Sequence, residues 1–191
     1  DVPLYGPTAE VHEVVTATPG SFDATVKGVE RLRSLGVGVV LHTTLFNSNL
    51  PALTDLLGFM GELKPDGVYL QVTGEVGRPG TYERVAPSPS SAAKAVAQAL
   101  DSTQPTFPVR VADVPRCLLP AHEAHVSVWR DRPELGAKTL VLPFTEWLST
   151  FSAGKTRDFG VRCEGCGVRD HCDGLSHEAL LRFGEHELRP R

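Results

Sequence analysis

Apolar residues in the first 114 positions repeat with two different periods. Helical spacing recurs over 21–36 and 53–63, whereas nearly continuous apolar, β-branched runs occupy 37–46 and 68–72. Runs of this kind predict strands that are covered on both faces. The pattern also predicts short strands at 2–5 and 109–111, a loop that holds Glu10, His12 and Glu13, and an Ala-rich helix at 92–100. Ser21 is expected to cap the helix that follows this loop, and the Asn47-Ser48-Asn49 segment to cap the next helix. Such alternation of strands and helices predicts a parallel sheet with helical crossovers.

The number of strand–helix units is too small for a complete fold of this class. Three units do not close a barrel, and a sheet of this size standing alone would expose long edges. The chain starts without Met, directly in a strand-like segment at 2–5. We therefore expect that it begins inside a larger protein. Residues 74–91 are rich in Gly, Pro and Ser and predict a long loop.

Composition excludes several classes of function. The 19 basic and 23 acidic residues leave a net charge of −4, which argues against a nucleic-acid or membrane-surface interface. No apolar run is long enough to span a bilayer, and residues 1–6 do not resemble a secretory signal. We expect a cytoplasmic protein, because its cysteines suit a reducing compartment.

The cysteines carry the strongest chemical signal. Cys163, Cys166 and Cys172 lie within ten residues and begin with a CxxC, whereas Cys117 stands alone. This spacing is typical of a metal site rather than a disulfide framework, and Gly165 and Gly167 permit the tight turn that it needs. Four thiolates suit zinc or a [4Fe–4S] cluster. A zinc site with three cysteines and either His171 or His177 is an alternative.

The order of several segments resembles a known family. Residues 2–7, 12–13, 19–23 and 28–32 are similar to the fourth strand and following helix of radical S-adenosylmethionine (SAM) enzymes, particularly peptide-maturing members with auxiliary iron–sulfur domains. The run at 37–46 followed by Asn49, Leu50 and Leu53 looks like their fifth strand and helix start, and 68–72 looks like the sixth strand. The tail has the spacing Cys163-x2-Cys166-x5-Cys172-Asp173-Gly174, followed by Gly184-x2-Glu187-Leu188-x-Pro190. It resembles the cluster-binding extension called SPASM, or twitch when shortened.

The resemblance implies an α/β fold in two parts. Residues 1–115 would form a partial parallel (β/α) barrel of the TIM type, the second half of a radical SAM barrel, and 116–191 a small Cys-rich, metal-binding extension. The extension would hold one auxiliary [4Fe–4S] cluster on Cys117 and the three later cysteines. On the SAM side of the barrel, the candidate cofactor-binding residues are Tyr5, Thr43 and Gln71. No catalytic residue stands out.

The chain also departs from the family pattern. The CxxxCxxC motif that carries the SAM-reducing cluster and the glycine-rich strand that grips SAM are absent from these 191 residues. SAM and a second [4Fe–4S] cluster are therefore expected only with a missing N-terminal half, and this chain alone is not expected to cleave SAM. Pro3 replaces a frequent serine, and Ser176 stands where the full SPASM pattern has another cysteine, which favours one auxiliary cluster.

Two main functions remain open from the sequence, beside the weaker alternative of a degenerate paralogue that regulates an active partner or presents substrate to it. The first is the C-terminal part of a radical SAM enzyme that modifies a peptide or a small molecule, with a flavodoxin or ferredoxin as a possible reductant. The second is a non-catalytic binding or scaffold module that folds around a structural, Cys-ligated zinc.

Overall fold

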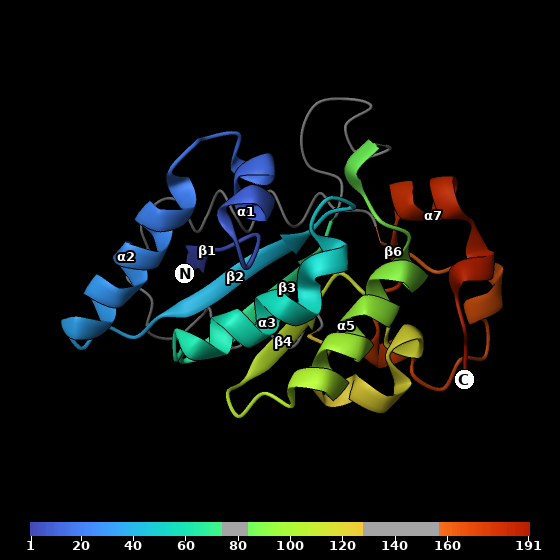
Figure 1. Cartoon of the computed structure of the whole chain (residues 1–191). Helices are drawn as coiled ribbons and strands as arrows, with labels where there is room; N and C mark the ends of the chain where they lie inside the picture. The colour runs from blue at the N-terminus through green and yellow to red at the C-terminus, as the bar shows by residue number, and fades with distance from the viewer. Residues whose placement is uncertain (74–83, 128–156) are drawn as a thin grey trace, which may run out of the picture.

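A parallel β-sheet forms the centre of the molecule (Figure 1). The computed structural model describes residues 1–73, 84–127 and 157–191. The four strands are β1 (Val2–Pro3), β2 (Val40–Leu45), β3 (Gly67–Val72) and β4 (Val109–Ala112), and they lie in this order. Each strand pairs in parallel with the next. The predicted mixed α/β fold with a parallel sheet is thus confirmed.

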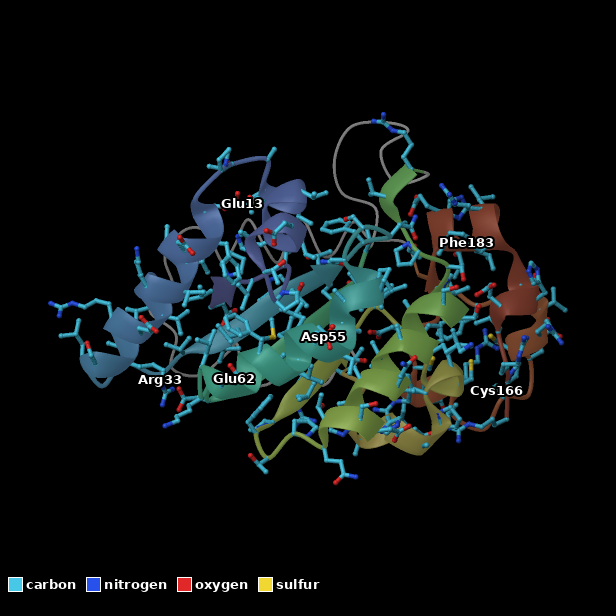
Figure 2. All side chains as sticks on the ribbon, in the orientation of Figure 1. Glu13, Arg33, Asp55, Glu62, Cys166 and Phe183 are labelled. Atoms are coloured by element: carbon cyan, nitrogen blue, oxygen red, sulfur yellow. The ribbon has the colours of Figure 1, made fainter. Side chains whose placement is uncertain are left out.

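Helices connect successive strands and cover one face of the sheet. They are α1 (Ala9–Thr16), α2 (Ser21–Ser34), α3 (Leu53–Glu62), which follows the short 3-10 helix η1 (Leu50–Ala52), and α5 (Pro89–Thr103). The main apolar core lies between these helices and the strands and includes the fully buried Met60 of α3, Val96 of α5 and Leu70 of β3. Asp55 and Glu62 lie on the solvent side of α3 (Figure 2).

The strand register divides the side chains between two different faces. Leu41 pairs with Val68 on the face buried beneath the helices, whereas the adjacent pair, His42 and Tyr69, lies on the opposite face. On that opposite face the side chains of β2 and of Tyr69 and Gln71 in β3 are only partly buried. The prediction that β2 is covered on both faces is therefore wrong for the described residues, because its burial alternates along the strand.

Sequential strand order distinguishes this sheet from a doubly wound fold, which contains a switch point where the strand order reverses. Barrels of the TIM type place their strands in sequence order. After β4, the chain passes through η2 (Arg116–Leu118) and η3 (Pro120–His125), and Val126 then forms a parallel bridge with Val111. The described part of the chain forms an open sheet, so the predicted barrel is not confirmed.

Two local predictions about the first half need correction. The segment expected to be a loop around residue 12 is helix α1. The Glu13 carboxylate of α1 accepts hydrogen bonds from the backbone N–H groups of Gly20 (2.7 Å) and Phe22 (3.4 Å). Glu13 therefore provides the acceptor for N–H groups at the start of α2, a role that was predicted for Ser21.

Asn49 was predicted to cap a helix and instead closes the turn after β2. Its Oδ1 accepts from the backbone N–H of Phe46 (2.8 Å), and its Nδ2 donates to the backbone oxygen of Thr44 (3.0 Å). These bonds satisfy both ends of a side chain that is 1% exposed.

The C-terminal residues form a small unit beside the N-terminal end of α5 (Figure 1). It contains the antiparallel pair β5 (Arg157–Asp158) and β6 (Leu175–Ser176), the helix α7 (His177–Phe183), and the 3-10 helices η6 (Val161–Cys163), η7 (Arg169–His171) and η8 (Glu185–Glu187). A second apolar cluster joins Cys117 to Cys163, Leu175 and Leu188. The division at residues 115 and 116 stays a prediction.

None of the described helices is both long enough and apolar enough to cross a membrane.

Candidate metal centre

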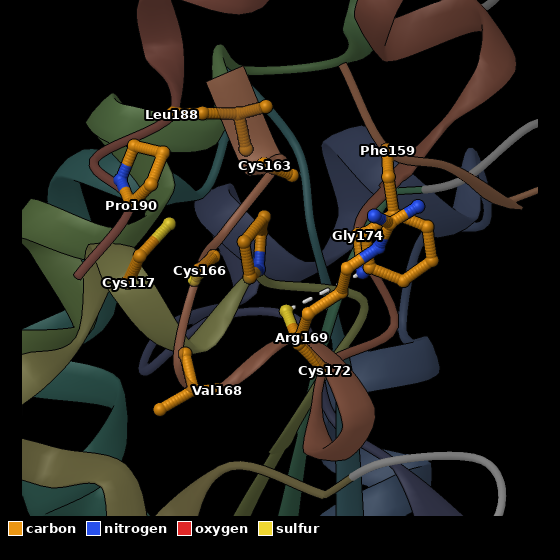
Figure 3. Close-up of a pocket in the computed structure, with 11 residues that line it drawn as sticks. Cys117, Phe159, Cys163, Cys166, Val168, Arg169, Cys172, Gly174, Leu188 and Pro190 are labelled. Carbon is orange, nitrogen blue, oxygen red and sulfur yellow. Dashed lines mark hydrogen bonds between the residues drawn. The ribbon is translucent and has the colours of Figure 1, made fainter. Parts of the chain in front are cut away.

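One cavity brings all four cysteines together (Figure 3). It contains about 290 Å³ of space, part of which is open to solvent. Apart from the thiols, the described residues of its walls are apolar side chains and glycine, with Arg169 as their one charged side chain. The residues that line it are Pro115, Cys117, Phe159, Cys163, Cys166, Val168, Arg169, Cys172, Gly174, Leu188 and Pro190.

Short turns aim the cysteines at this cavity. Cys117 lies in η2, directly after the sheet, and is 7% exposed. Cys163 ends η6, and the backbone N–H of Cys166 donates to the Cys163 carbonyl at 3.2 Å. Gly165 takes the positive φ (76°) that this turn requires. Cys172 follows η7, with its own N–H bonded to the carbonyl of Arg169.

Two of the sulfurs accept hydrogen bonds from the backbone. Gly174 N–H donates to Sγ of Cys172, and Arg189 N–H donates to Sγ of Cys117, each at 3.4 Å. Gly174 has φ of 66°, and a Cβ there would lie 2.5 Å from the backbone oxygen of Asp158, so only glycine fits. Backbone N–H donors of this kind stabilise thiolate ligands.

The thiols influence one another electrostatically. Burial raises the pKa of Cys117, and negative charge on Cys172, Cys163 and Cys166 raises it further, whereas the Arg189 N–H lowers it. Burial likewise raises the pKa of Cys163, with Cys166 and Cys172 as the next causes. Deprotonating all four thiols therefore requires a bound cation or cationic cluster to balance their charge.

Neither candidate histidine lines the cavity. His171 is exposed, and Nδ1 of His177 lies 2.5 Å from Oδ2 of Asp158. The three-cysteine, one-histidine alternative thus has no support in this arrangement. In the described part of the chain, no three His, Cys, Asp or Glu side chains are arranged to hold a single metal ion. The donor set, four thiols in an apolar wall, fits a group bound by soft ligands.

The structure does not bring the three candidate SAM contacts together. Gln71 lies on the sheet face opposite the helices, where its Nε2 donates to Oδ2 of Asp113 at 2.8 Å. Thr43 is 0% exposed and lies on the face beneath the helices, so it cannot contact a ligand placed beside Gln71. Tyr5 is partly buried, with its ring near His12. Their cofactor-binding role stays a prediction.

His42 and Asp113 are two residues of interest that the sequence did not single out. His42 lies on the same sheet face as Gln71, its Nε2 is buried without a hydrogen-bond partner among the described residues, and burial lowers its pKa. Asp113 is 8% exposed and has a positive φ of 61°. The alternation of side chains along β2 is the sequence signal that could have found His42, because it puts His42 on the other face of the sheet from Leu41 and Leu45.

Comparison with known proteins gives one partial match. A curated protein from Oleidesulfovibrio alaskensis, "AdoMet-dependent heme synthase", is 34% identical over 55 residues. Its name is that of a SAM-dependent enzyme. The match covers 29% of this chain and 14% of the relative, so the chain spans only a small part of the relative's length. No protein-family model and no solved structure matches the chain. The match supports a relationship to the radical SAM superfamily and extends no further.

Proposed function

We propose that this chain is the C-terminal part of a radical SAM enzyme and holds an auxiliary [4Fe–4S] cluster on Cys117, Cys163, Cys166 and Cys172. The observation that carries the proposal is that all four thiols line one cavity although Cys117 follows directly after the sheet and the other three lie in the tail, 46 or more positions later. The partial match to a SAM-dependent enzyme supports the wider assignment.

The arrangement favours a cluster over zinc. Tetrahedral zinc with bonds of 2.3 Å needs its four sulfurs only about 3.8 Å apart. The described thiols line a shared cavity but are not gathered as a single-ion site. A four-iron cluster binds its thiolates at separate corners of a larger core, so it suits a ring of cysteines around a cavity.

The chain's own residues would hold and tune this group. The four thiolates would ligate it, and the N–H groups of Arg189 and Gly174 would withdraw charge from two of the sulfurs. Arg169 lines the same cavity and places a positive charge beside an anionic thiolate set, while its guanidinium stacks 5.1 Å from the Phe159 ring centroid. When bound, a cluster ligated only by cysteine supplies single-electron transfer.

The sheet would supply one wall of the SAM and substrate site. Its partly buried face carries polar groups, including His42, Tyr69 and the hydrogen-bonded pair Gln71–Asp113. We propose a peptide or small-molecule substrate and a flavodoxin or ferredoxin as reductant. SAM cleavage would require the CxxxCxxC cluster, which these 191 residues do not contain.

Metal analysis after strictly anaerobic purification tests the proposal. Iron, acid-labile sulfide and zinc are measured per chain in the wild type and in a variant with all four cysteines changed to serine. We expect about four irons and four sulfides in the wild type and neither in the variant. Stoichiometric zinc with negligible iron would instead support the non-catalytic binding or scaffold module with a structural zinc.

A further inference from the structure

Residues 187–191 form one wall of the thiol cavity. Glu187 is the last residue of η8, and residues 188–191 continue from it without helix or strand structure, with side chains that alternate in exposure. Leu188 (1% exposed) and Pro190 line the cavity, whereas Arg189 and Arg191 are exposed. Period-two alternation is the geometry of an extended chain lying across a surface with one side facing inward.

The first residue of this segment anchors it to the sheet half of the molecule. Oε2 of Glu187 accepts a hydrogen bond from the backbone N–H of Ser90, at 2.7 Å, in the first turn of α5. The first N–H groups of a helix have no partner within the helix, and a carboxylate is favourable there. Glu187 therefore ties the tail to an element that contributes no cysteine.

The other end is anchored to both sides of the cavity. The backbone oxygen of Arg191 accepts from the N–H of Gly167, at 2.7 Å, in the CxxC turn. The Arg191 guanidinium forms an ion pair with Glu123 of η3. Between the two anchors, Arg189 N–H donates to the Cys117 sulfur. A five-residue segment thus contacts α5, the CxxC turn, η3 and one thiol directly.

We propose that residues 187–191 act as a strap that positions Cys117 and closes the thiol cavity against water, chelators and oxygen. The identity of the group protected in this way rests on the proposed function, whereas closure is a property of the metal-free chain. Leu188 supplies the buried contact and Glu187 the polar anchor. Removing either favours an opened segment in which the Cys117 thiol is accessible.

Alkylation of the metal-free, full-length chain tests closure directly. Iodoacetamide is reacted with native protein, and the rate at each cysteine is normalised to the rate in denaturant. Trypsin separates Cys117 (peptide 117–130), the pair Cys163 and Cys166 (163–169) and Cys172 (170–182), so mass spectrometry reports them independently. The variant is Leu188→Ala, and the matched control is Leu181→Ala, since Leu181 is 74% exposed.

We expect Leu188→Ala to increase labelling of Cys117 at least about tenfold, because truncation of a buried leucine removes most of the segment's apolar contact. Leu181→Ala should label like the wild type. Equal labelling of Cys117 in the wild type and in Leu188→Ala would overturn the strap.

A second pair of variants keeps the test sound if Leu188→Ala does not fold. Glu187→Ala removes the acceptor for the Ser90 N–H, whereas Glu187→Gln retains an amide oxygen that can accept the same bond. We expect faster Cys117 labelling in Glu187→Ala and near-complete rescue in Glu187→Gln. Equal labelling in all three proteins would contradict the anchor.

The anaerobically purified, loaded protein distinguishes failure of the strap from failure of the proposed function. Iron release to EDTA should be several-fold faster in Leu188→Ala than in the wild type or Leu181→Ala, with the same starting iron content. Unchanged release in Leu188→Ala would show that the segment does not guard the group. Wild-type protein without iron and sulfide would refute the auxiliary cluster, and alkylation would still decide the strap.

Discussion

Replacing Cys117 tests whether the sheet and the tail share one bound group. If Cys117 and Cys163 ligate the same cluster, they cross-link a loop of about 46 residues. Closing a loop of this length removes about 4 kcal/mol of entropy from the unfolded chain. Cys117→Ala should therefore lower the free energy of unfolding of the loaded protein by about 4–5 kcal/mol. In the metal-free protein, losing one small buried sulfur should cost only about 1 kcal/mol.

Anaerobic urea unfolding of both forms measures this difference, with iron content as a parallel readout. Val114→Ala is the matched control: Val114 is 3% exposed and close to Cys117 in sequence, yet has no thiol. It should cost about 2 kcal/mol in both the loaded and the metal-free form. If Cys117→Ala retained all its iron and lost the same stability in both forms, Cys117 would not be a ligand.

Three further predictions concern pH, helix capping and the glycine turns. Burial lowers the pKa of His42 in the folded state, so below about pH 6.5 the unfolded chain binds a proton that the folded chain does not, and stability falls as the pH drops from there. Urea unfolding of His42→Gln between pH 7 and 5 should show a shallower dependence, and an unchanged slope would contradict this. Glu13→Ala should cost about 1 kcal/mol, because two backbone N–H groups at the start of α2 lose their acceptor, whereas exposed Glu30→Ala should leave the urea midpoint unchanged. Equal midpoints for the two variants would refute the contact. Gly174→Ala should abolish iron binding, because its Cβ would lie 2.5 Å from the backbone oxygen of Asp158. Gly165→Ala has open space around its Cβ position, so it should keep its iron and lower the free energy of unfolding by about 1 kcal/mol. Full iron content in Gly174→Ala would contradict this prediction.

The elements of the sheet were predictable because their signals are local. The apolar run at 68–72 and the leucine stripe at 53–63 correspond to β3 and α3 as the structure has them. Helix α1 was missed because it is only eight residues long and its buried side chain is the polar His12, whereas Val14 is 68% exposed. Asn49 was misread because an asparagine that caps a helix and one that closes a turn look alike in sequence.

The candidate site was predictable only in part. Local spacing identified Cys163, Cys166 and Cys172, whereas Cys117 entered as the fourth thiolate that such a shell needs, and the family resemblance supported its place. The strap could not be predicted, because Ser90 and Glu187 are separated by 97 positions and neither residue type signals a contact at that range. The sheet face on which Thr43 lies could not be predicted, because deciding the face of a strand requires its register, and a shift of one residue exchanges the two faces.

An iron-edge anomalous difference map from a crystal of anaerobically purified protein tests the central claim most directly. We predict one compact iron peak inside the cavity, in contact with the sulfurs of Cys117, Cys163, Cys166 and Cys172. A peak at the zinc edge alone, or iron density that leaves the Cys117 sulfur out of contact, would contradict the account.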